Sequence, residues 1–135
     1  MQVSGAINFN EPDPLKSTIP LRGDTGKLAT ADKLTGISIA TDVSVWSGTN
    51  FNVKDNSGDA VKLFSRGLNY AGVRNLILSL WTPPGDRASE LLDFYRNKQA
   101  GMSPAEALRK AELQAISRDQ APHAWAAYQM VGIGH

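Results

Sequence analysis

The stretch Asp42–Phe51, DVSVWSGTNF, starts as a strand and ends as a turn that could carry a reactive group. Its first half alternates and is β-prone, whereas Ser47, Gly48 and Thr49 are small or turn-forming. In α/β proteins, ligands and catalytic groups lie at the carboxyl ends of parallel strands. This junction is therefore a candidate site, and a hydroxyl there, such as that of Thr49, would need a base beside it in order to react.

The chain contains few residues that could act as this base or bind a metal. It has no cysteine, and its two histidines are His123 and His135. There is no HExxH-like spacing, so a zinc site would need carboxylates to complete it, and we expect no metal and no cofactor. Pro122 marks a loop before His123, so we expect this histidine to be distant from Thr49 or solvated. The other candidate bases are carboxylates: Asp13, Asp24 and Asp59.

Length and composition are those of one soluble globular domain spanning residues 1–135. Of the 135 residues, 41% are hydrophobic and 20% are charged, which is not the composition of a disordered chain. Lys and Arg total 14 against 13 acids, so the net charge of +1 gives no reason to expect nucleic acid or an anionic membrane as a ligand. No apolar run could span a membrane and no signal-peptide pattern begins the chain, so we expect a cytoplasmic protein.

The hydrophobic pattern alternates between strands and helices, as is typical of an α/β protein. A mostly apolar run at residues 76–81 predicts a strand that is covered on both faces. The sequence Ser103-Pro104-Ala105-Glu106 is a capping box that predicts the start of a helix. The order of elements predicts a three-layer α/β sandwich with a mostly parallel sheet. The predicted strands are Met1–Ile7, Val43–Trp46, Leu76–Trp81 and Trp125–Val131. The predicted helices cover residues 31–34, 87–100 and 104–118, and a further helix is capped by Ser57 or Asp59 and runs to about Tyr70.

Five stretches of the chain follow the order of motifs in a known family. They are FNEPDPLKS, GKLATADKL, SGDAVKLFSRGLNYAGVRNLILSLW, FYRNKQAGMSPAEALRKAELQ and APHAWAAYQMVG. In this order they resemble the loop after the catalytic histidine strand, a short helix, the stretch after the nucleophile, the paired helices and the closing strand of CHAT domains. These domains are caspase-like peptidase relatives of the caspase–separase clan. The matching positions are Gly58, Asp59, Ala71, Gly72, Arg74, Ser79, Leu80, Trp81, Pro122, Trp125, Tyr128 and Gly132.

The resemblance implies a caspase-like fold that lacks the first strands of the family, and so an N-terminally truncated domain. It places the family's catalytic histidine at Ala6 and its catalytic cysteine at Thr49, so both positions of the catalytic pair are degenerate. The polar residue that usually follows the cysteine, often glutamate, is Asn50. The resemblance therefore favours a catalytically inactive pseudopeptidase that acts as a protein-binding or regulatory module.

A peptide or protein partner would bind at the carboxyl ends of adjacent strands, near Ala6, Thr49 and Trp81. The predicted binding residues are Thr49, Asn50, Asp59 and Trp81, although Trp81 could also belong to the core and Asp59 could simply begin a helix. Without the family's first strands, the N-terminal strand would be a bare edge, which predicts a homo-oligomer or a hetero-complex through it. Two alternatives remain: an active hydrolase that uses Thr49 with an unidentified base, and one half of a two-chain CHAT protein.

Overall fold

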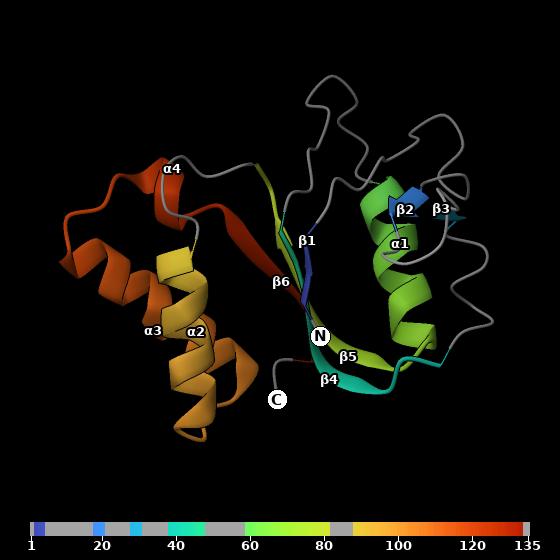
Figure 1. The fold of residues 1–135 in the computed structure, drawn as a ribbon, viewed down its shortest axis with the longest axis horizontal. Helices are drawn as coiled ribbons and strands as arrows, with labels where there is room; N and C mark the ends of the chain where they lie inside the picture. Colours follow the sequence, from blue (N-terminus) through green and yellow to red (C-terminus); the bar gives the residue numbers. More distant parts are fainter. Residues whose placement is uncertain are drawn as a thin grey trace.

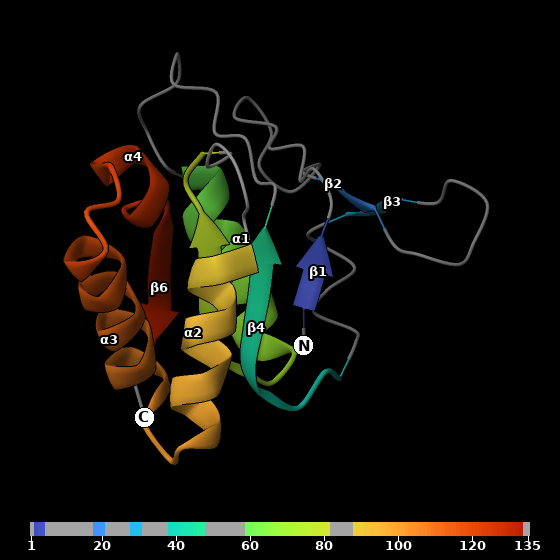
Figure 2. The same cartoon turned by 60° about the vertical axis from the view of Figure 1, so that its left-hand side comes forward.

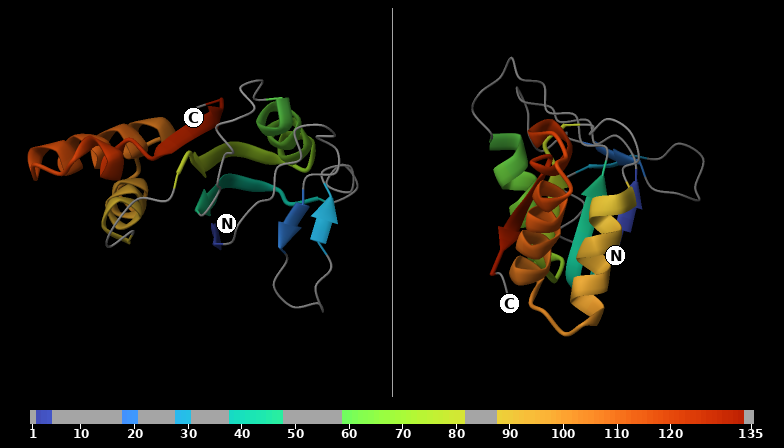
Figure 3. Two further views of the ribbon diagram at one scale, coloured as in Figure 1. Left: turned by 90° about the horizontal axis from the view of Figure 1, so that it is seen from above. Right: turned by 90° about the vertical axis from the view of Figure 1, so that its left-hand side faces the viewer.

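The computed structural model describes residues 2–4, 18–20, 28–30, 38–47, 59–81 and 88–133, which form a β-sheet flanked by helices and a separate two-stranded ribbon (Figure 1). The sheet contains β1 (Gln2–Ser4), β4 (Thr41–Ser47), β5 (Val73–Ser79) and β6 (Tyr128–Gly132). The helices are α1 (Asp59–Tyr70), α2 (Ala88–Gln99), α3 (Pro104–Ser117) and α4 (Pro122–Trp125). The ribbon pairs β2 (Thr18–Pro20) with β3 (Leu28–Thr30) (Figure 3).

The sheet is mixed, with the strand order β1-β4-β5-β6 (Figure 2). β1 and β5 both run parallel to β4, whereas β6 runs antiparallel to β5. The α/β class predicted from the sequence is confirmed. The closing strand differs from the prediction, because Trp125 ends helix α4 and β6 begins only at Tyr128. The physical reason is Pro122, whose fixed φ suits the first position of a helix.

On one face of the sheet, helix α1 covers a core of large side chains. Phe64 and Leu68 from α1 are buried against Trp46 of β4 and Leu76 of β5. The rings of Trp46 and Phe64 meet edge to face, with their centroids 5.4 Å apart, and such pairs contribute beyond the area that they bury. The indole N–H of Trp46 donates a hydrogen bond to Ser44 Oγ at 2.7 Å, so its polar atom is satisfied inside the core.

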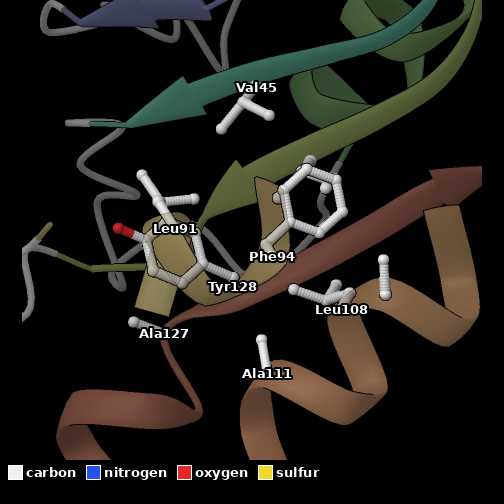
Figure 4. Packing of buried hydrophobic residues seen from close by; sticks show 9 residues of the cluster. Val45, Leu91, Phe94, Leu108, Ala111, Ala127 and Tyr128 are labelled. Carbon is white, nitrogen blue, oxygen red and sulfur yellow. The ribbon is translucent and has the colours of Figure 1, made fainter. Parts of the chain in front are cut away.

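Helices α2 and α3 cover the opposite face, so the sheet lies between helices. The side chains of Phe94, Leu108 and Tyr128 meet between α2, α3 and β6 (Figure 4). Burial on both faces explains why β5 is buried at every position except Arg74 and why Leu76, Ile77 and Leu78 follow one another without a polar residue. The strand begins at Val73, three residues earlier than predicted, because Val73 pairs with Thr41 of β4.

Helix α3 begins where the capping box predicts. Ser103 Oγ accepts a hydrogen bond from the Glu106 N–H at 3.4 Å, and Glu106 Oε2 accepts one from the Ser103 N–H at 3.1 Å. Pro104 occupies the first helical position. Local chemistry alone therefore fixes this helix start.

Candidate functional site

The carboxyl ends of three parallel strands meet at one edge of the sheet. Each of β1, β4 and β5 ends at a serine. Ser4 is the Cα partner of Ser47, and Trp46 pairs with Leu78, the residue just before Ser79. Ser47 is half-buried and Ser79 is fully buried. The sequence analysis did not identify this row of serines, because the register between strands cannot be read from the sequence of one strand.

Three of the predicted site residues, Ala6, Thr49 and Asn50, lie outside the described residues. Their positions in the sequence are still informative, because Ser4 and Ser47 are paired. Ala6 follows Ser4 by two residues, and Thr49 follows Ser47 by two residues. The two positions that the family uses for its histidine and cysteine thus come directly after matched ends of two adjacent strands.

Asp59 is the first residue of helix α1, and its side chain lies outside the described part of the structure. Its placement agrees with the interpretation that it begins a helix. An acidic residue is favourable there because the N-terminal end of a helix carries a partial positive charge. A direct role of Asp59 in binding stays a prediction.

Trp81 lies just beyond the carboxyl end of β5 and is held in place without being buried. Its indole N–H donates a hydrogen bond to the His123 carbonyl oxygen at 2.7 Å. The neighbouring Leu80 N–H donates to the Ala127 carbonyl oxygen at 2.6 Å. The Trp81 side chain is 38% exposed, whereas that of Trp46 is 2% exposed. Trp81 is therefore a fixed, accessible aromatic group at the edge where ligands of α/β proteins bind.

His123 is solvated but lies close to this edge. It is exposed, and it belongs to helix α4 rather than to the predicted loop. Its carbonyl contact with Trp81 places it next to the residue that follows β5. The expectation that His123 is solvated is confirmed. Its distance from Thr49 stays a prediction, because Thr49 lies outside the described residues. The Pro122 signal could have indicated the helix, because proline is favoured at its first position.

A cavity of about 870 Å³ lies at the opposite ends of the strands, and the sequence analysis did not predict it. It lies at the amino ends of β4 and β5. Its floor requires glycine at position 72, where φ is +97° and a Cβ would lie 3.1 Å from the Ala40 nitrogen. Asp42 at its rim forms an ion pair with Lys98 at 2.9 Å. The lining residues are Ala40, Thr41, Asp42, Asn69, Gly72, Val73, Arg74, Val131, Gly132 and Ile133.

Within the described ranges, no three His, Asp or Glu side chains form a group that could hold a metal ion. The helices of the same ranges are all too short or too polar to cross a membrane. Among the described side chains, the Ser47 hydroxyl, the fixed Trp81 indole and the exposed His123 lie at or near the carboxyl ends of these strands. These groups suit recognition by hydrogen bonding and aromatic contact.

The fold and this edge define an α/β domain with a mixed sheet, helices on both faces and a candidate site beyond three parallel strands. Comparison with protein families gives a match to the CHAT domain over residues 3–133. The chain therefore belongs to the CHAT domain family, and its fold is caspase-like. A comparison with curated proteins finds no match to this chain.

Proposed function

We propose that this CHAT domain is a catalytically inactive pseudopeptidase that works by binding a protein or peptide partner. One observation carries the proposal: the chain belongs to the family over residues 3–133 and contains no cysteine at all. A peptidase of this type needs a thiolate as its nucleophile, and the nucleophile needs a nearby base. Neither group stands at the positions that the family resemblance assigns to them.

The pairing of β1 with β4 supports the assignment of those positions. Ser4 and Ser47 are Cα partners, and Ala6 and Thr49 each follow one of these paired strand ends by two residues in the sequence. A histidine and a cysteine at these two places would be able to act together. An alanine has no group that could accept a proton, so the Thr49 hydroxyl receives no activation from this position.

Trp81 supports the binding role. A half-exposed aromatic side chain, fixed by a hydrogen bond and lying beside the carboxyl ends of parallel strands, provides a rigid wall for an extended peptide. We propose that Thr49, Asn50, Asp59 and Trp81 contribute to this groove. The net charge of +1 gives no reason to expect nucleic acid or a membrane, so we propose a protein ligand. We also propose that the protein acts in the cytoplasm.

A second proposal concerns assembly. Among the described strands, β1 pairs only with β4, at one end of the sheet order. An unpaired strand edge is a template for pairing with another chain. We therefore propose a homo-oligomer or a hetero-complex formed through β1, which includes the possibility that a second chain completes the domain.

One observation favours an active hydrolase as the alternative function. The backbone carbonyl of His123 accepts the hydrogen bond of the Trp81 indole, which makes this exposed histidine a candidate base for Thr49. This alternative requires that the imidazole reach the Thr49 hydroxyl, and it predicts turnover that depends on both residues.

A displayed peptide library panned against the purified chain tests the binding role. Enriched peptides are then measured by calorimetry on the native chain, on Trp81→Ala and on Tyr70→Ala. Tyr70 is the matched control, because it is a 77% exposed aromatic residue on α1. We expect affinity to fall about tenfold or more in Trp81→Ala, as for an aromatic anchor, and to be unchanged in Tyr70→Ala. Equal affinity for all three proteins would contradict the proposed groove.

A further inference from the structure

The interface between α2 and α3 contains acidic side chains that are removed from water. Glu90 and Asp93 on α2 are 6% and 5% exposed, respectively. Glu112 on α3 is half-buried. Carboxylates are rarely buried in this way unless each has a partner. The partners of these groups therefore decide how the interface behaves.

Asp93 has charged partners, and the interface is also joined by an amide. Arg118, which caps the carboxyl end of α3, lies 2.5 Å from Asp93 Oδ2, and Arg96 lies 3.4 Å from Asp93 Oδ1. Asn97 donates hydrogen bonds to the Ala107 carbonyl oxygen at 3.2 Å and to Gln114 Oε1 at 3.3 Å. The contacts of Asp93 with Arg118 and of Asn97 with Ala107 and Gln114 join the two helices without involving Glu90.

Glu90 differs, because its Oε1 atom has no hydrogen-bond partner among the described residues. Burial, together with the neighbouring carboxylates of Glu112 and Asp93, raises the pKa of Glu90 from 4.5 to about 8. Glu90 lies in the first turn of α2, where the helix dipole favours a negative charge. The loss of water outweighs the dipole, so Glu90 is mostly neutral at pH 7 in the folded protein.

Among the described residues, no cation pairs with Glu90. On α2 it faces Asp93, and from α3 it faces Glu112, whose pKa is also raised by burial. Arg118 is bound to Asp93. The sheet residues that pack in the cluster beneath α2 and α3 are Val45, Ile77 and Tyr128, with Val43 and Met130 beside them, so this core is largely apolar. An ionised Glu90 would therefore meet two acidic neighbours and an apolar core.

We propose that Glu90 makes the α2–α3 interface a pH-responsive element, which packs tightly while this carboxyl group is neutral and loosens when it ionises. The proposal stands independently of the proposed peptide binding. We expect the loosening to be confined to α2 and its neighbourhood. This neighbourhood includes the candidate site, because α2 is the next described element after Trp81 in the chain. A partner that contacts α2 or the edge at Trp81 would then be bound differently at neutral and at alkaline pH.

The sign of the effect follows from proton linkage. Between pH 4.5 and about 8 the folded chain retains a proton on Glu90 that the unfolded chain has released. The free energy of unfolding contributed by this group therefore falls as pH rises through this window, and is constant above it. A glutamine at position 90 cannot ionise and removes this dependence.

Thermal unfolding of the full chain from pH 5 to pH 9 tests the proposal with Glu90→Gln. We expect the Tm of the variant minus that of the native chain to rise by about 5 °C or more over this range. Asp119→Asn is the matched control, because it removes an exposed acid just beyond the end of α3, the other helix of the interface, and its Tm difference should stay constant. A constant difference for Glu90→Gln as well would overturn the proposal.

Two further measurements on folded protein locate the effect. An NMR titration of the Glu90 side-chain carbons in the native chain is expected to give a midpoint above pH 7, and a midpoint near 4.5 would overturn the proposal even if the glutamine variant did not fold. Amide hydrogen exchange, corrected for the intrinsic effect of pH, is expected to show α2 losing protection at alkaline pH while α1 retains it. Equal loss in both helices would mean that no local element responds to pH.

Discussion

At the scale of single residues, Trp46 and Trp81 show how the end of a strand changes the role of one side chain. Both follow apolar strand sequences, but Trp46 still lies within β4 and points into the core beside Phe64. Trp81 lies two residues beyond β5, where the sheet no longer covers it, and its N–H reaches the His123 carbonyl. The first tryptophan is needed for stability, and we assign the second to recognition.

This difference predicts unequal losses of stability. Trp46→Ala is expected to cost about 3–5 kcal/mol in the free energy of unfolding, as for a fully buried aromatic residue. Trp81→Phe keeps most of the ring and removes the N–H donor, so it is expected to cost about 1 kcal/mol. Denaturant unfolding monitored by circular dichroism measures both changes. A loss for Trp81→Phe as large as that for Trp46→Ala would mean that Trp81 is a core residue.

Part of the candidate site could be read from the sequence and part could not. Trp81 was predicted as a wall residue because an apolar run ends there, which is a local signal. The serines that end β1, β4 and β5 were missed, since only pairing between strands places Ser4 beside Ser47. The contact between Trp81 and His123 joins residues 42 positions apart, and no pattern within a short stretch could have indicated it.

At the scale of elements, helix α3 shows how far local chemistry determines structure. Its start was predicted correctly because Ser103, Pro104 and Glu106 act on one another within a single turn. The hydrogen bonds from Ser103 hold the pKa of Glu106 below its ordinary value. The support from Glu106 is therefore present at neutral pH and is lost as pH falls through the lowered pKa.

Removal of the cap is expected to destabilise the domain modestly. Ser103→Ala is predicted to cost about 1 kcal/mol, the usual effect of losing a serine N-cap. Ser117→Ala at the other end of α3 is the matched control, because Ser117 Oγ donates only to the Gln114 carbonyl within the same exposed turn. Denaturant unfolding of both variants makes the comparison. Equal stability of Ser103→Ala and the native chain would show that packing alone fixes the helix start.

The elements around α4 and β5 were predicted less well, because distant contacts determine them. Val73 joins β5 through its pairing with Thr41, although glycine and arginine on either side do not look strand-like. Asn75 is fully buried in the same strand, where its amide donates to the Asp42 carbonyl oxygen at 3.2 Å. A polar residue inside a strand is tolerated there because its hydrogen bond comes from the neighbouring strand.

At the scale of the whole molecule, the position of β1 at one end of the described sheet predicts association. We expect light scattering to show a mass above that of the 14.5 kDa monomer at high protein concentration. Amide exchange gives a local test, because β1 should gain protection as concentration rises, whereas β6 at the other end of the described sheet should not. A strict monomer at high concentration, together with the absence of any partner in the cell, would count against the proposed edge.

The loss of peptidase chemistry is the central claim, and a direct assay of peptide hydrolysis tests it. The native chain, Thr49→Ala and His123→Ala are incubated with a diverse library of peptides, and cleavage is followed by mass spectrometry. We predict the same background cleavage for all three proteins, because Ala6 provides no base and the chain provides no thiolate. Sustained turnover by the native chain that disappears in Thr49→Ala would contradict the claim, and its loss in His123→Ala as well would identify the base.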